Sequence, residues 1–272
     1  MRIGRRTALS GLLAASSAHA QAPDLRFLAR RAAIWLAPLH AMYLRRHRDI
    51  VERGHKLNRL IREQPAPDGS LRATAWLDLS GEPMFVTLPR MNDTPYSAVL
   101  VDPFQRTLAE MRGPAPRPWM VGGPAWDGVA ESGLDAIRAP CRSPWLRYVL
   151  DDATDAARAL LLETPDEHNQ RRTLEMQELM RYRTDLPPEP VADWLPPRPA
   201  DPFDLFDTAL AMLGECRLGS NDMQMVEELA PLRLRPGRRF DARAFGDAER
   251  QSMLQGIADA QPQIAAAKAF LN

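Results

Sequence analysis

The stretch from Ser70 to Asp102 constrains the fold most, because it contains three strand-like segments joined by short turns. In residues 72–79, every second side chain is apolar, which places four of them on one side: Ala73, Ala75, Leu77 and Leu79. A period of two is typical of a strand that is buried on one face. Residues 84–88 and 96–101 are further short apolar runs, each followed within two residues by a proline. We therefore predict three strands in an antiparallel meander.

Helical patterns precede and follow these strands. Residues 24–62 are predicted to form a helix in two pieces, kinked or divided at Pro38, with a core-facing stripe of Leu28, Ala32, Trp35, Leu39 and Met42. We also predict strands at 119–121 and 145–150 and helices at 151–163 and 164–182. Further helices are predicted from Asp201 or Pro202 to Glu215, from Asn221 or Asp222 to Ala230, and at 247–271, the last interrupted near Pro262. The predicted class is α+β: a small antiparallel β-sheet or half-barrel packed with helices, followed by a Pro-linked helical tail.

The N-terminus has the features of an export signal. Arg5 and Arg6 precede a mildly apolar segment, and Ala18-His19-Ala20 is a small-x-small pattern that predicts cleavage before Gln21. Paired arginines indicate the bacterial twin-arginine route, with an ordinary secretory signal or the frayed helix of a cytoplasmic protein as alternatives. No later run approaches about 18 consecutive apolar residues. We therefore expect a periplasmic or secreted protein without a transmembrane anchor after cleavage.

Proline distribution suggests how the chain is divided. Seven prolines between Thr184 and Pro202 predict a stiff, extended connector. The expected organisation is a signal peptide at 1–20, an α+β core domain at 21–183, the connector at 184–202 and a helical tail at 203–272.

Charge and motif content exclude several classes of function. The net charge is zero, and the first 20 residues hold three arginines and no acid, so the remainder is slightly acidic and unsuited to non-specific nucleic-acid binding. The sequence has no nucleophile elbow, zinc-protease motif, phosphate loop or Cys-x-x-Cys pair. His40 and His47 lie seven residues apart, without a third ligand at suitable spacing. We therefore predict no metal and no cofactor. Cys141 and Cys216 could form one disulfide in an oxidising compartment or remain buried thiols.

Several motifs resemble one bacterial family. They are Trp76-Leu77-Asp78-Leu79-Ser80 with Pro83, Pro89, Tyr96-Ser97, Asp102-Pro103, Gly123-Pro124-Ala125-Trp126-Asp127-Gly128, Pro202-Phe203-Asp204-Leu205-Phe206, Asp222 and Pro236-Gly237-Arg238-Arg239-Phe240-Asp241. Together they resemble the family catalogued as domain of unknown function 1254. The resemblance implies export and a following β-rich domain of unknown function 1214. We expect a short member without that domain, which a separate partner protein could supply.

One family motif departs from the expected pattern. The family usually carries Pro-Asn-x-Asp-Thr-x-Tyr before its Trp-Leu-Asp-Leu strand, but residues 67–72 lack both the Asp and the Tyr. A similar sequence, Asn92-Asp93-Thr94-Pro95-Tyr96-Ser97, occurs one strand later.

The strand-rich segment also supplies the candidate site residues. Trp76, Asp78, Tyr96 and Trp126 could line a polar-aromatic pocket for a sugar-like or other small polar ligand, or serve an envelope interaction. A rival hypothesis is hydrolysis by Asp78 with Asp93 or Asp102. The structural alternative is that the carboxylates of Asp78 and Asp102 cap turns while Trp76 and Trp126 fill the core. A truncated relative without independent activity is a further possibility.

Overall fold

The computed structural model describes residues 23–62, 71–87, 96–112, 117–128, 133–150, 161–163 and 196–271. Several sequence predictions lie outside these ranges: the signal peptide at 1–20, the helix at 164–182 and most of the connector at 184–202.

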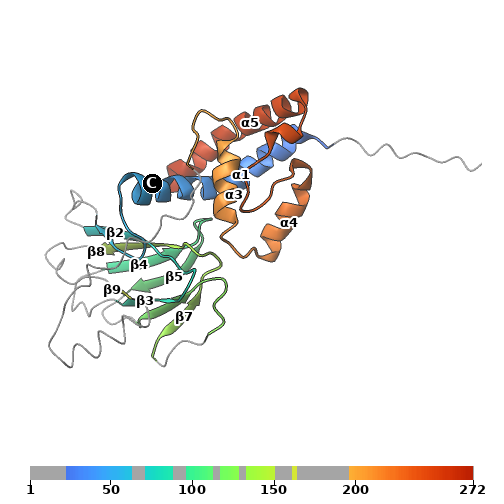
Figure 1. The fold of residues 1–272 in the computed structure, drawn as a ribbon. Helices are drawn as coiled ribbons and strands as arrows, with labels where there is room; N and C mark the ends of the chain where they lie inside the picture. The colour runs from blue at the N-terminus through green and yellow to red at the C-terminus, as the bar shows by residue number, and fades with distance from the viewer. Residues whose placement is uncertain are drawn as a thin grey trace, which may run out of the picture.

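Within the described residues, a helix comes first, nine strands follow and helices come last (Figure 1). Helix α1 spans Leu25–Arg46 and continues as a π-helical segment, His47–Glu52. The strands are β1 (Ile61–Arg62), β2 (Leu71–Trp76), β3 (Met84–Thr87), β4 (Tyr96–Val101), β5 (Thr107–Arg112), β6 (Trp119–Gly122), β7 (Asp135–Arg138), β8 (Trp145–Leu150) and β9 (Leu161–Glu163). The tail contains α3 (Asp204–Leu213), α4 (Ser220–Glu228), α5 (Asp247–Leu271) and 3₁₀ turns at Ala230–Leu232 and Ala242–Ala244.

The strands form two sheets rather than one. A five-stranded antiparallel sheet has the order β1-β2-β8-β4-β5, and a four-stranded mixed sheet has the order β7-β6-β3-β9 with β6 and β7 parallel. The α+β class and the position of β4 are confirmed, but the predicted meander is wrong. Strands β2 and β4 both pair with β8, and β3 belongs to the other sheet. Later strands insert between the early ones, a long-range pairing that local alternation does not encode.

The two sheets enclose an apolar core. Side chains with alternate spacing from β2, β4 and β8 face the four-stranded sheet, whose β3 and β6 contribute Met84, Val86, Trp119 and Val121. The predicted apolar side of residues 72–79 is confirmed, since Ala73, Ala75, Leu77 and Leu79 all belong to this core. The alternation thus identified the face correctly even though the neighbouring strands were not those expected.

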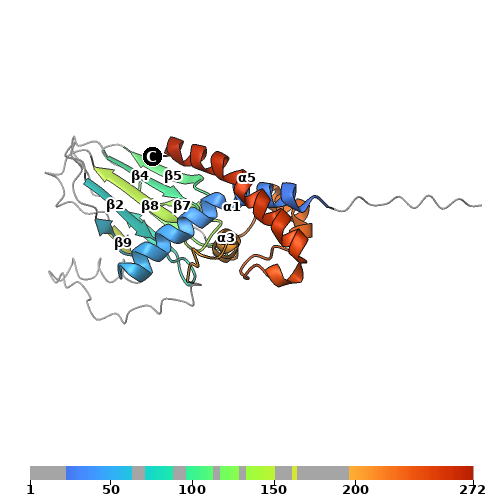
Figure 2. The ribbon, with the colours of Figure 1, turned by 90° about the horizontal axis from the view of Figure 1, so that it is seen from above.

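The helices form a second apolar core against the other face of the five-stranded sheet (Figures 1 and 2). Helix α1 packs against α5 and also contacts α3, so the first and last helices of the described residues are neighbours. Trp76, Val101 and Trp145 extend this core from the sheet. Four phenylalanines pack together around the start of α3: Phe203, Phe206, Phe240 and Phe245.

Some predicted helix boundaries are wrong. Helix α1 runs through Pro38 and α5 runs through Pro262, so of the kink or division predicted at Pro38 the division is excluded, and the interruption predicted near Pro262 does not occur. Helical structure stops at Glu52, well before the predicted end at Arg62, which instead belongs to β1. Residues 161–163, predicted as the end of a helix, pair with β3 as β9. At Arg62 and at residues 161–163, pairing with a neighbouring strand outweighs the local helical pattern.

None of the helices in the described ranges combines the length and apolar character needed to cross a bilayer.

Candidate functional site

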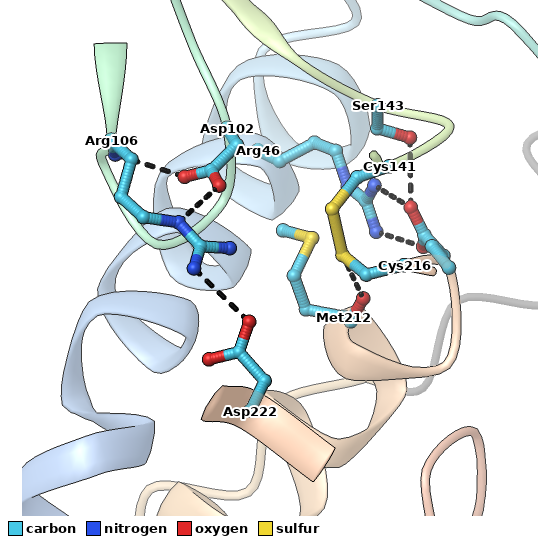
Figure 3. Close-up of a disulfide and its surroundings, with 9 residues drawn as sticks. Arg46, Asp102, Arg106, Cys141, Ser143, Met212, Cys216 and Asp222 are labelled. Atoms are coloured by element: carbon cyan, nitrogen blue, oxygen red, sulfur yellow. Dashed lines mark hydrogen bonds and ion pairs between the residues drawn. A yellow bond between two sulfur atoms is a disulfide. The ribbon is translucent and has the colours of Figure 1, made fainter. Parts of the chain in front are cut away.

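A disulfide fastens the helical tail to the strand-rich part of the chain (Figure 3). Cys141 follows β7 and Cys216 follows α3, with 75 residues between them in sequence. Two backbone hydrogen bonds flank the bridge: Arg142 N donates to the Glu215 carbonyl (3.1 Å) and Arg217 N donates to the Pro140 carbonyl (2.6 Å). The two outcomes left open by the sequence, disulfide or buried thiols, are thereby decided in favour of the disulfide.

A buried ion pair lies beside the disulfide. The Arg46 side chain is 1% exposed and donates two hydrogen bonds to the Glu215 carboxylate, each 2.7 Å, while Ser143 Oγ donates a third at 2.8 Å (Figure 3). Burial alone would raise the pKa of Glu215, but the charge and hydrogen bonds of Arg46 lower it below its ordinary value. Glu215 is therefore ionised and holds α1 against the segment after α3.

A second link between sheet and tail is centred on Arg106 (Figure 3). Its Nε donates to Asp102 Oδ2 at 2.7 Å and its Nη1 donates to Asp222 Oδ2 at 3.0 Å. Asp102 also accepts from the backbone N of Arg106 at 2.9 Å, which closes the tight turn after β4. Burial alone would lower the pKa of Arg106, but its hydrogen bonds to the two carboxylates raise it above the ordinary value. The two motif residues Asp102 and Asp222, 120 positions apart, thus meet at one guanidinium.

A pocket of about 370 Å³, here called the junction pocket, lies between the ion pairs of Arg106 and the residues next to the disulfide. Three arginines line it, Arg106, Arg138 and Arg217, together with Trp126 and Asp222. The remaining lining residues are Gly123, Pro124, Ala139, Pro140, Leu218 and Gly219. The pocket is therefore cationic, with an aromatic side and apolar patches, and its size is in the range of small-molecule sites.

The glycine-rich motif after β6 shapes the aromatic side of the junction pocket. Trp126 folds back over Gly122, where an added Cβ would lie 2.1 Å from a ring atom. Gly123 lies against the segment that follows β2, since a Cβ on Gly123 would be 2.5 Å from the Leu79 carbonyl oxygen. The Arg138 guanidinium lies 5.7 Å from the centre of the Trp126 ring, a cation–π contact. Glycine is needed at both positions, because any larger side chain would meet the Trp126 ring or the Leu79 carbonyl oxygen.

The structure places the predicted site residues in different surroundings. Trp76 is completely buried; its Nε1 donates to Asp49 at 3.1 Å, and its ring centre lies 6.0 Å from that of Trp145. Asp78 accepts hydrogen bonds from Ser80 N at 3.0 Å and Ser80 Oγ at 2.5 Å in the turn after β2.

The register of the five-stranded sheet decides which candidates come near one another. Trp76 and Val101 both align with Trp145, so Asp78 and Asp102 leave the same end of the sheet, separated by β8. Tyr96 aligns with Leu150 at the opposite end. Asp93 lies outside the described residues. Of the candidates, Trp126 lines the junction pocket and Asp102 contacts it through Arg106.

The arginines of the junction pocket were not identified from the sequence. Arg106 follows Asp102 by four residues, a spacing that could have indicated their pairing within a turn. Arg138 and Arg217 lie three and one residues from the two cysteines. If the disulfide had been assumed, the sequence would therefore have placed Arg138 and Arg217 near each other. Neither arginine belongs to a recognisable sequence motif.

Other polar groups serve the fold in ways visible from their contacts. His40 Nδ1 lies 2.7 Å from Thr208 Oγ1, and His47 Nδ1 lies 3.2 Å from Glu52. Asp207 accepts from the Phe240 backbone N at 2.7 Å, which ties the tail motif at 236–241 to α3. Within the ranges that the structure describes, no three His, Cys, Asp or Glu side chains are grouped so as to hold a metal ion.

Comparison with known proteins supports the resemblance seen in the motifs. Residues 65–167 match the model of a family described as protein of unknown function (DUF1254). The match contains the Trp-Leu-Asp-Leu segment and the Trp126 loop, so the predicted resemblance is confirmed for this part of the chain. No curated protein matches the chain.

A solved structure shares the fold. It is the crystal structure of the VPA0106 protein from Vibrio parahaemolyticus, which superposes with a TM-score of 0.69 at 17% sequence identity. The similarity covers 88% of this chain and 58% of the Vibrio chain. This chain therefore spans little more than half the length of that protein, and at this identity the likeness concerns the fold alone.

Proposed function

We propose that this is an exported protein that binds a small polar molecule in the junction pocket. The observation that carries the proposal is the pocket lining. Arg138, Arg217 and part of Trp126 face one cavity, and neither of these two arginines forms an ion pair within the described residues. Binding pockets combine apolar and aromatic surface with a few polar groups that orient the ligand. The junction pocket has both components.

The contacts of the two described carboxylates favour binding over hydrolysis. A general acid or base must be free to exchange a proton with the substrate. The Asp78 carboxylate accepts two hydrogen bonds within its own turn, and the Asp102 side chain is 1% exposed and paired with Arg106. These are turn-forming and structural roles, so we propose binding as the activity and place Trp126, rather than Trp76 or Tyr96, against the ligand.

Two observations support export. The first 20 residues carry the paired arginines and the small-x-small pattern, and the Cys141–Cys216 disulfide suits an oxidising compartment. The twin-arginine route is tested by expressing the full chain in a bacterial host and sequencing the N-terminus of the periplasmic protein. We expect Gln21 at the new N-terminus and retention inside the cell for Arg5→Lys/Arg6→Lys, with Arg2→Lys as the control that is still exported.

Binding is tested by blocking the junction pocket without disturbing its walls. A Cβ on Gly219 would meet nothing within 4 Å, so Gly219→Leu should fill the pocket while the protein stays folded. Gly81 is equally open and lies in a turn outside the pocket lining, so Gly81→Leu is a matched control. Calorimetric titration of both variants and the unaltered protein with sugars, amino acids and organic acids should yield ligands whose binding Gly219→Leu alone abolishes. A ligand unaffected by Gly219→Leu would bind elsewhere and contradict the proposal.

A further inference from the structure

We propose that the ligand of the junction pocket is a small organic dianion, a molecule with carboxylate or phosphate groups on a short carbon skeleton. The inference rests on the proposed function and specifies the ligand class for the same pocket.

The charges of the pocket are the first step. Arg106 adds no net positive charge to the pocket, because its one charge is paired with two carboxylates, those of Asp102 at 2.7 Å and Asp222 at 3.0 Å. Arg138 donates only to carbonyl oxygens within the described chain, those of Asp127 and Gly128, at 3.4 Å and 3.5 Å. These are long contacts to neutral groups, and no acidic side chain of the described residues compensates the charge of Arg138.

Arg217 is the second uncompensated cation. Its backbone is fixed by the hydrogen bond to Pro140, but within the described residues its guanidinium has no hydrogen bond, ion pair or ring contact. Two guanidinium groups without acidic partners therefore face one cavity, and a ligand with two negative charges would balance them. Guanidinium binds planar carboxylate and tetrahedral phosphate oxygens through paired N–H donors, which makes arginine the usual side chain for such ligands.

The backbone beside Arg217 adds to this preference. Helix α4 begins at Ser220 directly beside the pocket residue Gly219, and no side chain caps its first turn. Free N–H groups at a helix start favour a nearby negative charge. Asp222 also lies in that turn, but its carboxylate is paired with Arg106.

The apolar lining indicates an organic ligand rather than a bare ion. Trp126, Pro124, Pro140 and Leu218 line the same cavity as the arginines. Inorganic phosphate would occupy a small part of about 370 Å³ and would leave the indole face uncovered. The short carbon skeleton of an organic dianion would cover it, so both kinds of lining find a partner in one molecule.

The experiment compares probes of different charge on the full-length protein. Calorimetric titrations with succinate, glycerol 3-phosphate, inorganic phosphate and glucose separate dicarboxylate, organic phosphate, bare anion and neutral sugar. We expect succinate or glycerol 3-phosphate to bind more tightly than phosphate or glucose, and the better of the two identifies the acidic group. Arg217→Gln should weaken that binding roughly 10- to 100-fold, the loss expected for hydrogen bonds to a charged group. Arg235→Gln, an exposed arginine of the tail outside the pocket lining, is the control and should leave binding unchanged.

The possible results separate this inference from the proposed function. Glucose binding that Gly219→Leu abolishes, without binding of either organic anion, would overturn the ligand class and leave the proposed function intact. Failure of all four probes together with a full sugar, amino acid and organic acid panel would overturn both. Anion binding that is equal in Arg217→Gln and Arg235→Gln would also overturn the inference, because the pocket arginine would then play no part.

Discussion

Replacing Arg46 with methionine tests how much the buried ion pair beside the disulfide stabilises the protein. The substitution keeps an unbranched, mainly aliphatic side chain, shorter than that of arginine, and leaves Glu215 without its cation. The Arg46 side chain is 1% exposed and that of Glu215 11%, and two 2.7 Å hydrogen bonds join them. Removing one partner of a buried ion pair costs about 3–5 kcal/mol, because the remaining charge is left in a poorly solvated site. For a chain of this size the melting temperature should fall by roughly 10 °C.

Chemical denaturation monitored by tryptophan fluorescence measures this loss, and a surface pair provides the control. Arg26 forms a comparable two-bond pair with Asp259, at 2.7 Å and 3.1 Å, but both side chains are largely exposed. Arg26→Met should therefore change stability little, because exposed pairs are screened by solvent. The double variant Arg46→Met/Glu215→Leu should recover most of the loss, since it removes both buried charges.

The pH dependence gives a second, independent readout. In the unaltered protein, the pKa of Glu215 lies below its ordinary value, so its contribution is complete above that value and is lost on acidification. Without Arg46, burial should raise the pKa of Glu215 above its ordinary value. The stability difference between Arg46→Met and the unaltered protein should then narrow as the pH falls from 7 toward 4.5. A loss no larger than that of Arg26→Met, or a difference that widens with acidification, would refute this account.

Three further predictions follow from single features. Reducing the Cys141–Cys216 disulfide should lower the free energy of unfolding by about 2–4 kcal/mol, measured by denaturant titration with and without reductant; an unchanged midpoint would contradict it. Gly123→Ala should destabilise by about 1–3 kcal/mol because its methyl group would lie 2.5 Å from the Leu79 carbonyl oxygen, and a melting temperature equal to that of the parent would disprove the close approach. Burial raises the pKa of Tyr43 to about 12, so the free energy of unfolding should fall as the pH rises from about 10 to about 12. Absorbance at 295 nm, compared between the unaltered protein and Tyr43→Phe, follows the ionisation of Tyr43. Ionisation of Tyr43 near pH 10, about the ordinary value for tyrosine, would contradict the prediction.

Local sequence patterns predicted the elements better than their arrangement. The alternation in residues 72–79 identified the buried face, and the limits of β4 and β8 were predicted to the residue. Pairing was not predictable in the same way, because β8 inserts between β2 and β4 only after some 45 further residues of chain. Nothing in the local pattern of a strand specifies which distant strand lies beside it.

Prolines in the helices show a different limit. A proline inside a helix removes one backbone hydrogen bond and usually bends or ends it. Yet α1 continues through Pro38 and α5 through Pro262, and these two helices pack against each other. Apolar burial along the shared surface, with Leu36, Leu39 and Met42 on α1, stabilises the helical state on both sides of the proline. That compensation depends on a partner helix more than 200 residues away in sequence.

The site was partly predictable for a related reason. The motif carrying Trp126 was recognised, whereas Arg138 and Arg217 belong to distant segments of the chain that meet beside the disulfide between Cys141 and Cys216. The same bridge that joins sheet to tail thus also assembles the cationic side of the pocket, and Arg106 ties the opposite side through Asp102 and Asp222. The disulfide and the ion pairs of Arg106 each join the strand-rich part of the chain to the helical tail. Loss of either link should therefore loosen the pocket while both apolar cores stay folded. Ligand affinity is therefore expected to respond to disulfide reduction more strongly than the packing of the sheets does.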